Sequence, residues 1–166
     1  PVLSVGANAA YTHTEQDLKT VSTNDGFTFG TSFADRTSDE LEGASPFIVN
    51  ADINYSPVFG NYKPRATVVF SYFSDRIYAL GSGTLGNMVE KGVPVLNFVW
   101  KNSFGEHFEA NLNVRNILNP DVTLVRENTG VSDNNPLLQG FVENEEVTLR
   151  SYNRGINVGL TLKYKI

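Results

Sequence analysis

The last eleven residues of the chain alternate strictly between apolar and polar or small side chains. Successive side chains of a β-strand point to opposite faces, so this segment is predicted to be a strand with one apolar face and one polar face. Strands of soluble sheets average about 5 to 6 residues, whereas a tilted strand needs about 9 to 11 to cross a bilayer. The segment is therefore expected to cross a membrane. Its apolar face consists of Ile156, Val158, Leu160, Leu162, Tyr164 and Ile166.

The same two-residue alternation recurs in five earlier segments, and most Gly and Pro residues lie between them. No helical period of 3.6 residues runs long enough to compete with this pattern. The sequence thus predicts an all-β chain whose strands form an antiparallel transmembrane β-barrel. The five segments are 3–12, 47–55, 66–73, 95–101 and 108–115.

The connections between these segments differ in length in a regular order. Long polar connections at 14–46 and 119–146 and a medium one at 75–93 alternate with short turns at 57–64 and 102–106. Outer-membrane barrels have long outward loops and tight periplasmic turns, so all the longer connections are expected at one end. Both ends of the chain would then lie on the side of the short turns. The glycine-rich segment 81–86 is expected to be part of an outer loop.

Aromatic residues are placed near the ends of the predicted strands. Tyr and Trp favour the membrane interface because one side of the ring is apolar and the other is wet. The alternative is a set of rim residues on a soluble β core. A girdle on the short-turn side is predicted at Tyr55, Tyr62, Trp100, Phe104 and Tyr164, together with Phe59 and Phe108, and the opposite girdle at Tyr11, Phe47, Tyr72, Tyr78 and Tyr152.

Composition limits the possible functions. The net charge is -5, whereas nucleic-acid binding favours a basic surface, so no nucleic-acid partner is expected. No apolar run reaches the roughly 18 residues that a transmembrane helix needs. The chain has no cysteine, and its two histidines, His13 and His107, are far apart, so neither a metal site nor a cofactor is predicted. No nucleophile–base pair is visible, and an enzymatic role such as that of a hydrolase barrel is not expected.

The polar residues of two strands are the candidate functional residues. In a membrane barrel they would face the lumen, since a charge on the lipid side would cost about 2 to 4 kcal/mol. For any single residue, the alternative is that it only hydrates the wall. The candidates for contact with an inner domain or a passing substrate are Asp52, Glu109, Asn111, Asn113 and Arg115.

Six strands are too few for a closed membrane barrel, because single-chain barrels begin at about eight strands. One possibility is that weakly β-like segments at 26–33 and 137–142 complete an autonomous barrel of about eight strands with an anchoring or adhesion role. The other is that the chain, 1–166, is the C-terminal segment of a larger barrel. Segments 122–125 and 147–150 are interpreted as an extension of the last strand pair above the membrane. The start of the chain is already strand-like and has no signal-peptide pattern, so a processed product or a segment of a longer protein is expected.

Four segments together resemble a known family. They are LEGASPFIVNADINYSP at 41–57, RATVVFSYFSDRI at 65–77, NVRNILNP at 113–120 and YNRGINVGLTLKYKI at 152–166. In this order they resemble the C-terminal barrel of TonB-dependent outer-membrane receptors, especially the SusC-like branch. The family usually closes on Phe, whereas this chain ends on Ile166.

The resemblance implies a barrel of 22 strands in the bacterial outer membrane, of which this chain would supply the last six. It implies uptake of a nutrient such as an oligosaccharide or a peptide, with the plug and the earlier strands lying outside this chain. The implied partners are the lipid bilayer and lipopolysaccharide, the remainder of the receptor, TonB acting through the N-terminal part, and a surface lipoprotein of the SusD-like kind. Tyr164 and Ile166 would form the C-terminal signal for barrel assembly.

Overall fold

The computed structural model describes residues 2–18, 36–81, 85–128 and 146–166. These residues form β-strands joined by turns and irregular segments, and all the pairings between strands are antiparallel. No helix of the described residues is long and apolar enough to cross a membrane. The prediction of an all-β antiparallel chain is thus confirmed. The strands are β1 (Leu3–Tyr11), β2 (Gln16–Asp17), β3 (Ser38–Asp39), β4 (Phe47–Tyr55), β5 (Tyr62–Phe73), β6 (Arg76–Ala79), β7 (Leu85–Glu90), β8 (Val93–Phe104), β9 (Phe108–Arg115), β10 (Asp121–Asn128), β11 (Val147–Asn153) and β12 (Asn157–Tyr164).

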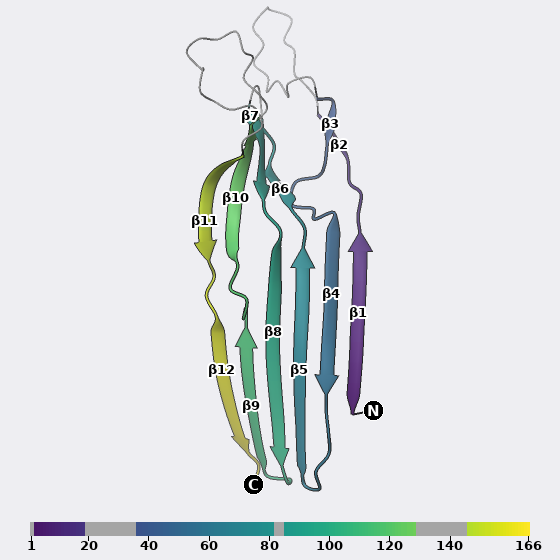
Figure 1. Cartoon of the computed structure of the whole chain (residues 1–166), viewed down its shortest axis with the longest axis vertical. Helices are drawn as coiled ribbons and strands as arrows, with labels where there is room; N and C mark the ends of the chain where they lie inside the picture. The colour runs from purple at the N-terminus through teal and green to yellow at the C-terminus, as the bar shows by residue number, and fades with distance from the viewer. Residues whose placement is uncertain (1, 19–35, 82–84, 129–145) are drawn as a thin grey trace, which may run out of the picture.

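The largest element is a six-stranded sheet with the order β1-β4-β5-β8-β9-β12. Its strands run side by side along the long axis of the molecule (Figure 1). The turns β4–β5 and β8–β9 and both ends of the chain lie at one end of this sheet, as the connection lengths predict. The strands coincide closely with the six segments of alternating sequence, although β5 and β8 are longer than expected, with 12 residues each.

The register separates the sheet into an apolar face and a polar face. Residues paired across an antiparallel ladder point to the same face. One continuous row crosses all six strands on the apolar side, and the adjacent row is polar or small in all strands except β8. The first row is Leu3, Tyr55, Ala66, Trp100, Leu112 and Leu160; the second is Ser4, Asn54, Thr67, Val99, Asn113 and Gly159.

Nothing within the described residues covers the apolar face. Val5 on β1 is 70% exposed, and Leu160 on β12 is 67% exposed. The hydrophobic side chains that are buried belong instead to the region of the second sheet: Ile77, Val89, Val122 and Val125. The six-stranded sheet therefore has no core of its own in the described part of the chain.

A second sheet, with the order β11-β10-β7-β6, continues four strands of the first one. The strands β5, β8, β9 and β12 are interrupted at the same level, and β6, β7, β10 and β11 follow beyond the break (Figure 1). The extension predicted from 122–125 and 147–150 is present as the pair β10–β11. The prediction of a loop at 81–86 is wrong where it includes Leu85 and Gly86, because both belong to β7.

Two asparagines shape the break between β9 and β10. Asn116 has φ 58° and Asn119 has φ 43°, a left-handed conformation that Asn tolerates better than most residues. Asn116 Nδ2 donates to the carbonyl of Gly155 at 2.8 Å, and the amide of Gly155 donates to Asn119 Oδ1 at 2.9 Å. The turn after β9 is thereby tied to the break between β11 and β12.

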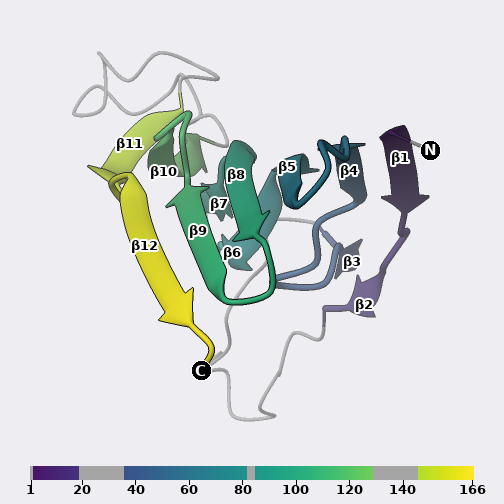
Figure 2. The same cartoon turned by 90° about the horizontal axis from the view of Figure 1, so that it is seen from below.

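The described strands do not close into a barrel. β1 and β12 are the two edges of the six-stranded sheet, and they lie at its opposite ends in the view along the strands (Figure 2). Neither edge has a strand partner on its outer side among the described residues. The segments 26–33 and 137–142, the possible further strands of a small barrel, lie outside the described residues.

Candidate functional site

The polar face has a hollow of about 350 Å³ between β8, β9 and β12. Alternation on each strand brings the polar side chains to this side, and the register places them next to one another. Gly159 leaves room at the hollow, since a Cβ built on it would meet no atom within 4 Å. The polar side chains of the lining are Lys101, Asn111, Asn113, Arg115, Asn157 and Thr161.

The hollow is positively charged. The side chains of Lys101 and Arg115 form no hydrogen bond and no ion pair with any described residue, and no Asp or Glu belongs to the lining. Asn113 contributes a side-chain Oδ1 that is buried without a hydrogen-bond partner in the described structure. The site thus combines two unpaired cations with amide and hydroxyl groups.

The structure brings together three of the five predicted lumen residues, namely Asn111, Asn113 and Arg115. Asp52 lies on the same face but over Gly6 of β1, where a Cβ on Gly6 would clash with its carboxylate. Asp52 Oδ2 accepts a hydrogen bond of 2.6 Å from Asn54 Nδ2. Glu109 lies near the short-turn end and is paired with Lys165 Nζ at 2.7 Å. These two carboxylates are occupied locally and do not belong to the hollow.

The charge of the polar face is opposite in sign to that of the whole chain. Five cationic side chains and two acidic ones lie on this face of the six-stranded sheet, whereas the chain has a net charge of -5. The pattern of any single strand does not reveal this concentration of positive charge, because the cations belong to four different strands and only the register aligns them. They are Lys63, Arg65, Lys101, Arg115 and Lys163.

On the apolar face, an aromatic row crosses four strands at the short-turn end. Tyr62, Phe104, Phe108 and Tyr164 are consecutive partners in the ladder. The rings of Tyr62 and Phe104 are stacked with centroids 4.8 Å apart, and Phe104 and Phe108 follow at 5.8 Å. Trp100, 40% exposed, belongs to a row nearer the middle of the sheet. Apart from Phe59, which lies in the β4–β5 turn, the predicted girdle residues therefore share one face and occupy two levels, since Tyr55 shares the row of Trp100.

The opposite girdle is only partly at the level that was expected. Tyr11 and Phe47 are partners at the far end of β1 and β4, and Tyr72 lies near the far end of β5. Tyr78 and Tyr152 lie instead on β6 and β11 of the second sheet. The prediction that all five residues form one girdle is wrong, because the extension carries these two beyond the end of the six-stranded sheet.

The two residues proposed as an assembly signal lie beside the β8–β9 turn. Tyr164 is 72% exposed, and its ring centroid lies 6.2 Å from that of His107. The amide of Lys165 donates to the carbonyl of His107 at 2.8 Å. Ile166 is fully exposed. The last residues thus continue the β9–β12 ladder to the end of the sheet.

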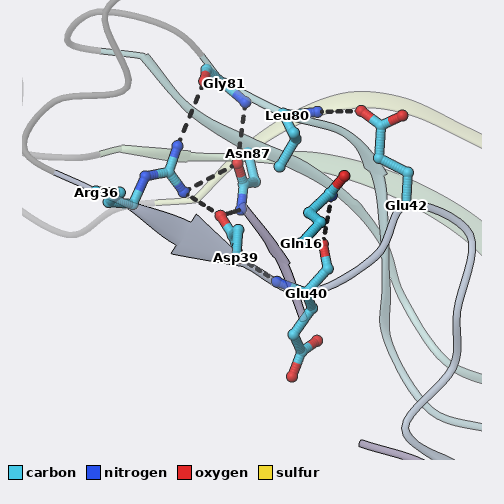
Figure 3. Close-up of polar contacts among 8 residues, drawn as sticks. All are labelled: Gln16, Arg36, Asp39, Glu40, Glu42, Leu80, Gly81 and Asn87. Carbon is cyan, nitrogen blue, oxygen red and sulfur yellow. Dashed lines mark hydrogen bonds and ion pairs between the residues drawn. The ribbon is translucent and has the colours of Figure 1, made fainter. Parts of the chain in front are cut away.

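A polar cluster at the second sheet connects β3 with the β6–β7 hairpin (Figure 3). Asn87, 5% exposed, accepts hydrogen bonds from the amide of Gly81 and from Arg36, and donates one to Asp39. Arg36 also pairs with Asp39 at 2.5 Å. A hollow of about 430 Å³ next to this cluster is lined by charges of both signs, and its polar groups near Asn87 already satisfy one another.

Lys91, just beyond β7, is the centre of a second charged group. Its Nζ contacts Glu146 at 2.5 Å and Asp75 at 3.2 Å. The hydrogen bond to Glu146, followed by the contacts with Asp75, raises the pKa of Lys91 above its usual value, against the opposing effect of burial. These two contacts tie the connection between β7 and β8 to the β5–β6 connection and to the residue before β11.

No group of three or more His, Cys, Asp or Glu side chains that could hold a metal ion occurs among the described residues. His13 follows β1 and His107 lies within the β8–β9 turn, so the two histidines are at opposite ends of the six-stranded sheet. Comparisons with known proteins find no match: no family model fits the chain, and no curated protein or solved structure is significantly similar to it.

Proposed function

We propose that this chain forms part of the wall of an outer-membrane transport barrel of the TonB-dependent receptor type, as the sequence resemblance implies. The observation that carries the proposal is the continuous apolar face of the six-stranded sheet, which no described residue covers. Exposure of such a face to water would cost about 25 cal/mol of free energy per Å² of apolar surface. Lipid chains are the environment that removes this cost, while the polar face lines an aqueous interior.

The height of the apolar face supports this assignment. Tyr62 and Tyr72 lie on the same face of β5, near its two ends. Their separation of ten residues corresponds to about 33 Å along the strand, or about 23 Å at a tilt of about 45°. The apolar band of outer-membrane barrels is about 25 Å tall and is bordered by aromatic residues on both sides.

The open edges favour a wall segment over a complete barrel. β1 and β12 each present backbone donors and acceptors that have no partner among the described residues. In the hydrocarbon of a membrane, each unpaired group would cost roughly several kcal/mol of free energy. In the proposed barrel, strands outside the described residues pair with both edges. The plug, TonB and a SusD-like lipoprotein would then act through parts of the receptor other than this chain.

Neighbouring valines on β5 offer a direct test. Val68 lies in the apolar row with Ile53 and Phe98, whereas Val69 lies on the polar face beside Asp52. The chain has no native cysteine, so Val68→Cys or Val69→Cys adds a single labelling position to it. Each variant carries a small fluorescent label in the full protein reconstituted into vesicles, with any cysteine outside this chain replaced by Ser.

Quenchers attached to lipid chains should strongly reduce the emission of the label at position 68 and leave that at position 69 nearly unchanged. A water-soluble quencher should reduce the emission at position 69 more than that at position 68. Equal quenching of the two positions by lipid-attached quenchers would contradict a lipid-facing sheet, since adjacent residues of a membrane-crossing strand point to opposite environments.

A further inference from the structure

We propose that the hollow between β8, β9 and β12 is a binding subsite for an acidic oligosaccharide, whose carboxylates pair with Lys101 and Arg115. The proposal rests on the proposed function, because the polar face must line a water-filled passage for a solute to reach the hollow. It adds a substrate class to that function, namely polyhydroxylated solutes that carry negative charge.

The first argument is charge. Lys101 and Arg115 line the hollow without an ion-pair partner in the described structure, and no carboxylate belongs to the lining. The nearest acidic residue along β9 is Glu109, which is already paired with Lys165. Arginine binds carboxylates through two parallel hydrogen bonds, and lysine supplies a mobile point charge. An anionic solute is therefore favoured at this position over a neutral or cationic one.

The second argument is the spacing of the two cations. Lys101 is paired with Asn111 in the β8–β9 ladder, and Arg115 lies four residues further along β9. The two levels are thus about 13 Å apart along the strand direction. Two charges separated in this way along one wall suit an elongated solute with more than one acidic unit better than a compact anion.

The third argument is the chemistry between the cations. Asn111, Asn113, Asn157 and Thr161 offer both donors and acceptors, which matches the hydroxyl groups of a sugar. The buried Oδ1 of Asn113 has no partner in the described structure. No aromatic side chain lines the hollow, so a flat apolar ligand would gain little there.

Gly159 provides a steric test that leaves both cations in place. A Cβ on this residue meets no atom within 4 Å, so a side chain added here starts in open space. Gly159→Leu should fill the hollow, whereas Gly159→Ala should leave most of it open. Asn111→Asp, which keeps the shape of the side chain, would place a carboxylate opposite Lys101 and neutralise it.

The experiment uses the full protein in lipid nanodiscs and titration calorimetry. The ligands are the tetrasaccharides of galacturonate, mannuronate and glucuronate, each compared with its methyl ester, which has the same length and no charge. The variants are Lys101→Gln with Arg115→Gln, Asn111→Asp and Gly159→Leu. Lys63→Gln, on the same face but outside the hollow, is the matched control.

We expect at least one acid to bind about tenfold or more tightly than its ester, as charge-assisted hydrogen bonds would produce. This preference should be lost in the double variant, in Asn111→Asp and in Gly159→Leu, and retained in Lys63→Gln. Equal binding of acid and ester for all three sugars, or an unchanged preference in the double variant, would overturn the proposal. So would equally effective competition by inorganic sulfate, which would indicate a simple anion site.

One further outcome would show that Lys101 and Arg115 pair with another part of the protein and not with a solute. If the double variant lowers the unfolding temperature of the protein and leaves acid binding unchanged, the anionic partner is an acidic side chain from another part of the receptor, and the proposal is wrong. The lipid-quenching result at Val68 and Val69 is independent of these titrations. Failure of the sugar site can thereby be distinguished from failure of the membrane assignment.

Discussion

At the scale of single residues, Asn102 is the exception on the apolar face. It is 5% exposed and lies on β8 between Pro64 and Ala110 of the neighbouring strands. The hydroxyl of Tyr62 donates to its Oδ1 at 2.8 Å. A buried amide that loses its partner costs about 1 to 3 kcal/mol. One member of the aromatic row thus satisfies the polar group that lies on the apolar face.

We therefore expect Tyr62→Phe to lower the free energy of unfolding by about 1 to 2 kcal/mol, since the ring remains and only the hydroxyl is removed. Tyr55→Phe is the matched control, because Tyr55 is also on the apolar face and its hydroxyl has no partner among the described residues. Urea-dependent unfolding of the protein in lipid vesicles measures both variants. Equal stability of the two would show that the Tyr62–Asn102 hydrogen bond does not contribute.

At the scale of elements, the second sheet depends on close packing between β7 and β10. Gly86 of β7 lies so close to the backbone of Glu127 that a Cβ would overlap its carbonyl. The ladder between these strands also shifts register between Arg126 and Asn128. The buried side chains Ile77, Val89 and Val125 are consecutive partners in this sheet. The extension is thus a small packed unit built onto the end of a sheet that has no core of its own.

Gly86→Ala should destabilise the extension by about 1 to 3 kcal/mol, the usual cost of forcing an added group into a packed site. Amide hydrogen exchange should become faster in β7 and β10 and stay unchanged in β5 and β8. Gly159→Ala, where a Cβ meets no atom within 4 Å, should alter neither region. Faster exchange throughout the six-stranded sheet would contradict the separation of the two units.

At the scale of the whole molecule, β1 and β12 are two separate edges of the six-stranded sheet. Their separation distinguishes a barrel closed by this chain alone from a larger barrel. In the six-stranded sheet four strands lie between them. Neighbouring strands are about 4.8 Å apart, so a barrel closed by this chain alone would bring the two edges to that distance. A larger barrel would keep them apart and pair each with another strand.

Cysteines at Ser4 of β1 and Thr161 of β12, both on the polar face, test this difference. We expect Ser4→Cys with Thr161→Cys to form no disulfide under mild oxidation of the full protein in membranes. The positive control is Ser4→Cys with Asn54→Cys, whose positions are direct partners in the β1–β4 ladder. Efficient cross-linking of Ser4→Cys with Thr161→Cys would support the autonomous small barrel and sink the larger one.

Much of the fold follows from local sequence. Strict alternation over 3–12, 47–55 and 108–115 predicts the corresponding strands, because the backbone itself imposes the period of two. The hairpin β6–β7 was not predicted. β6 has only four residues, its pairing with β7 is irregular, and the other partner of β7 is β10, which is distant in sequence.

The candidate site likewise depends partly on local sequence and partly on long-range pairing. Asn111, Asn113 and Arg115 were predicted together because they alternate on one strand, and the sequence alone determines that they share a face. Lys101, Asn157 and Gly159 join them only through the register of β8, β9 and β12, which depends on long-range backbone pairing. Periodicity thus determined which residues face each side of the sheet, whereas the tertiary structure alone decided which strands are neighbours, because hydrogen bonding between distant segments leaves no local pattern. The positive hollow, the ion pair of Glu109 with Lys165 and the two open edges all follow from that pairing.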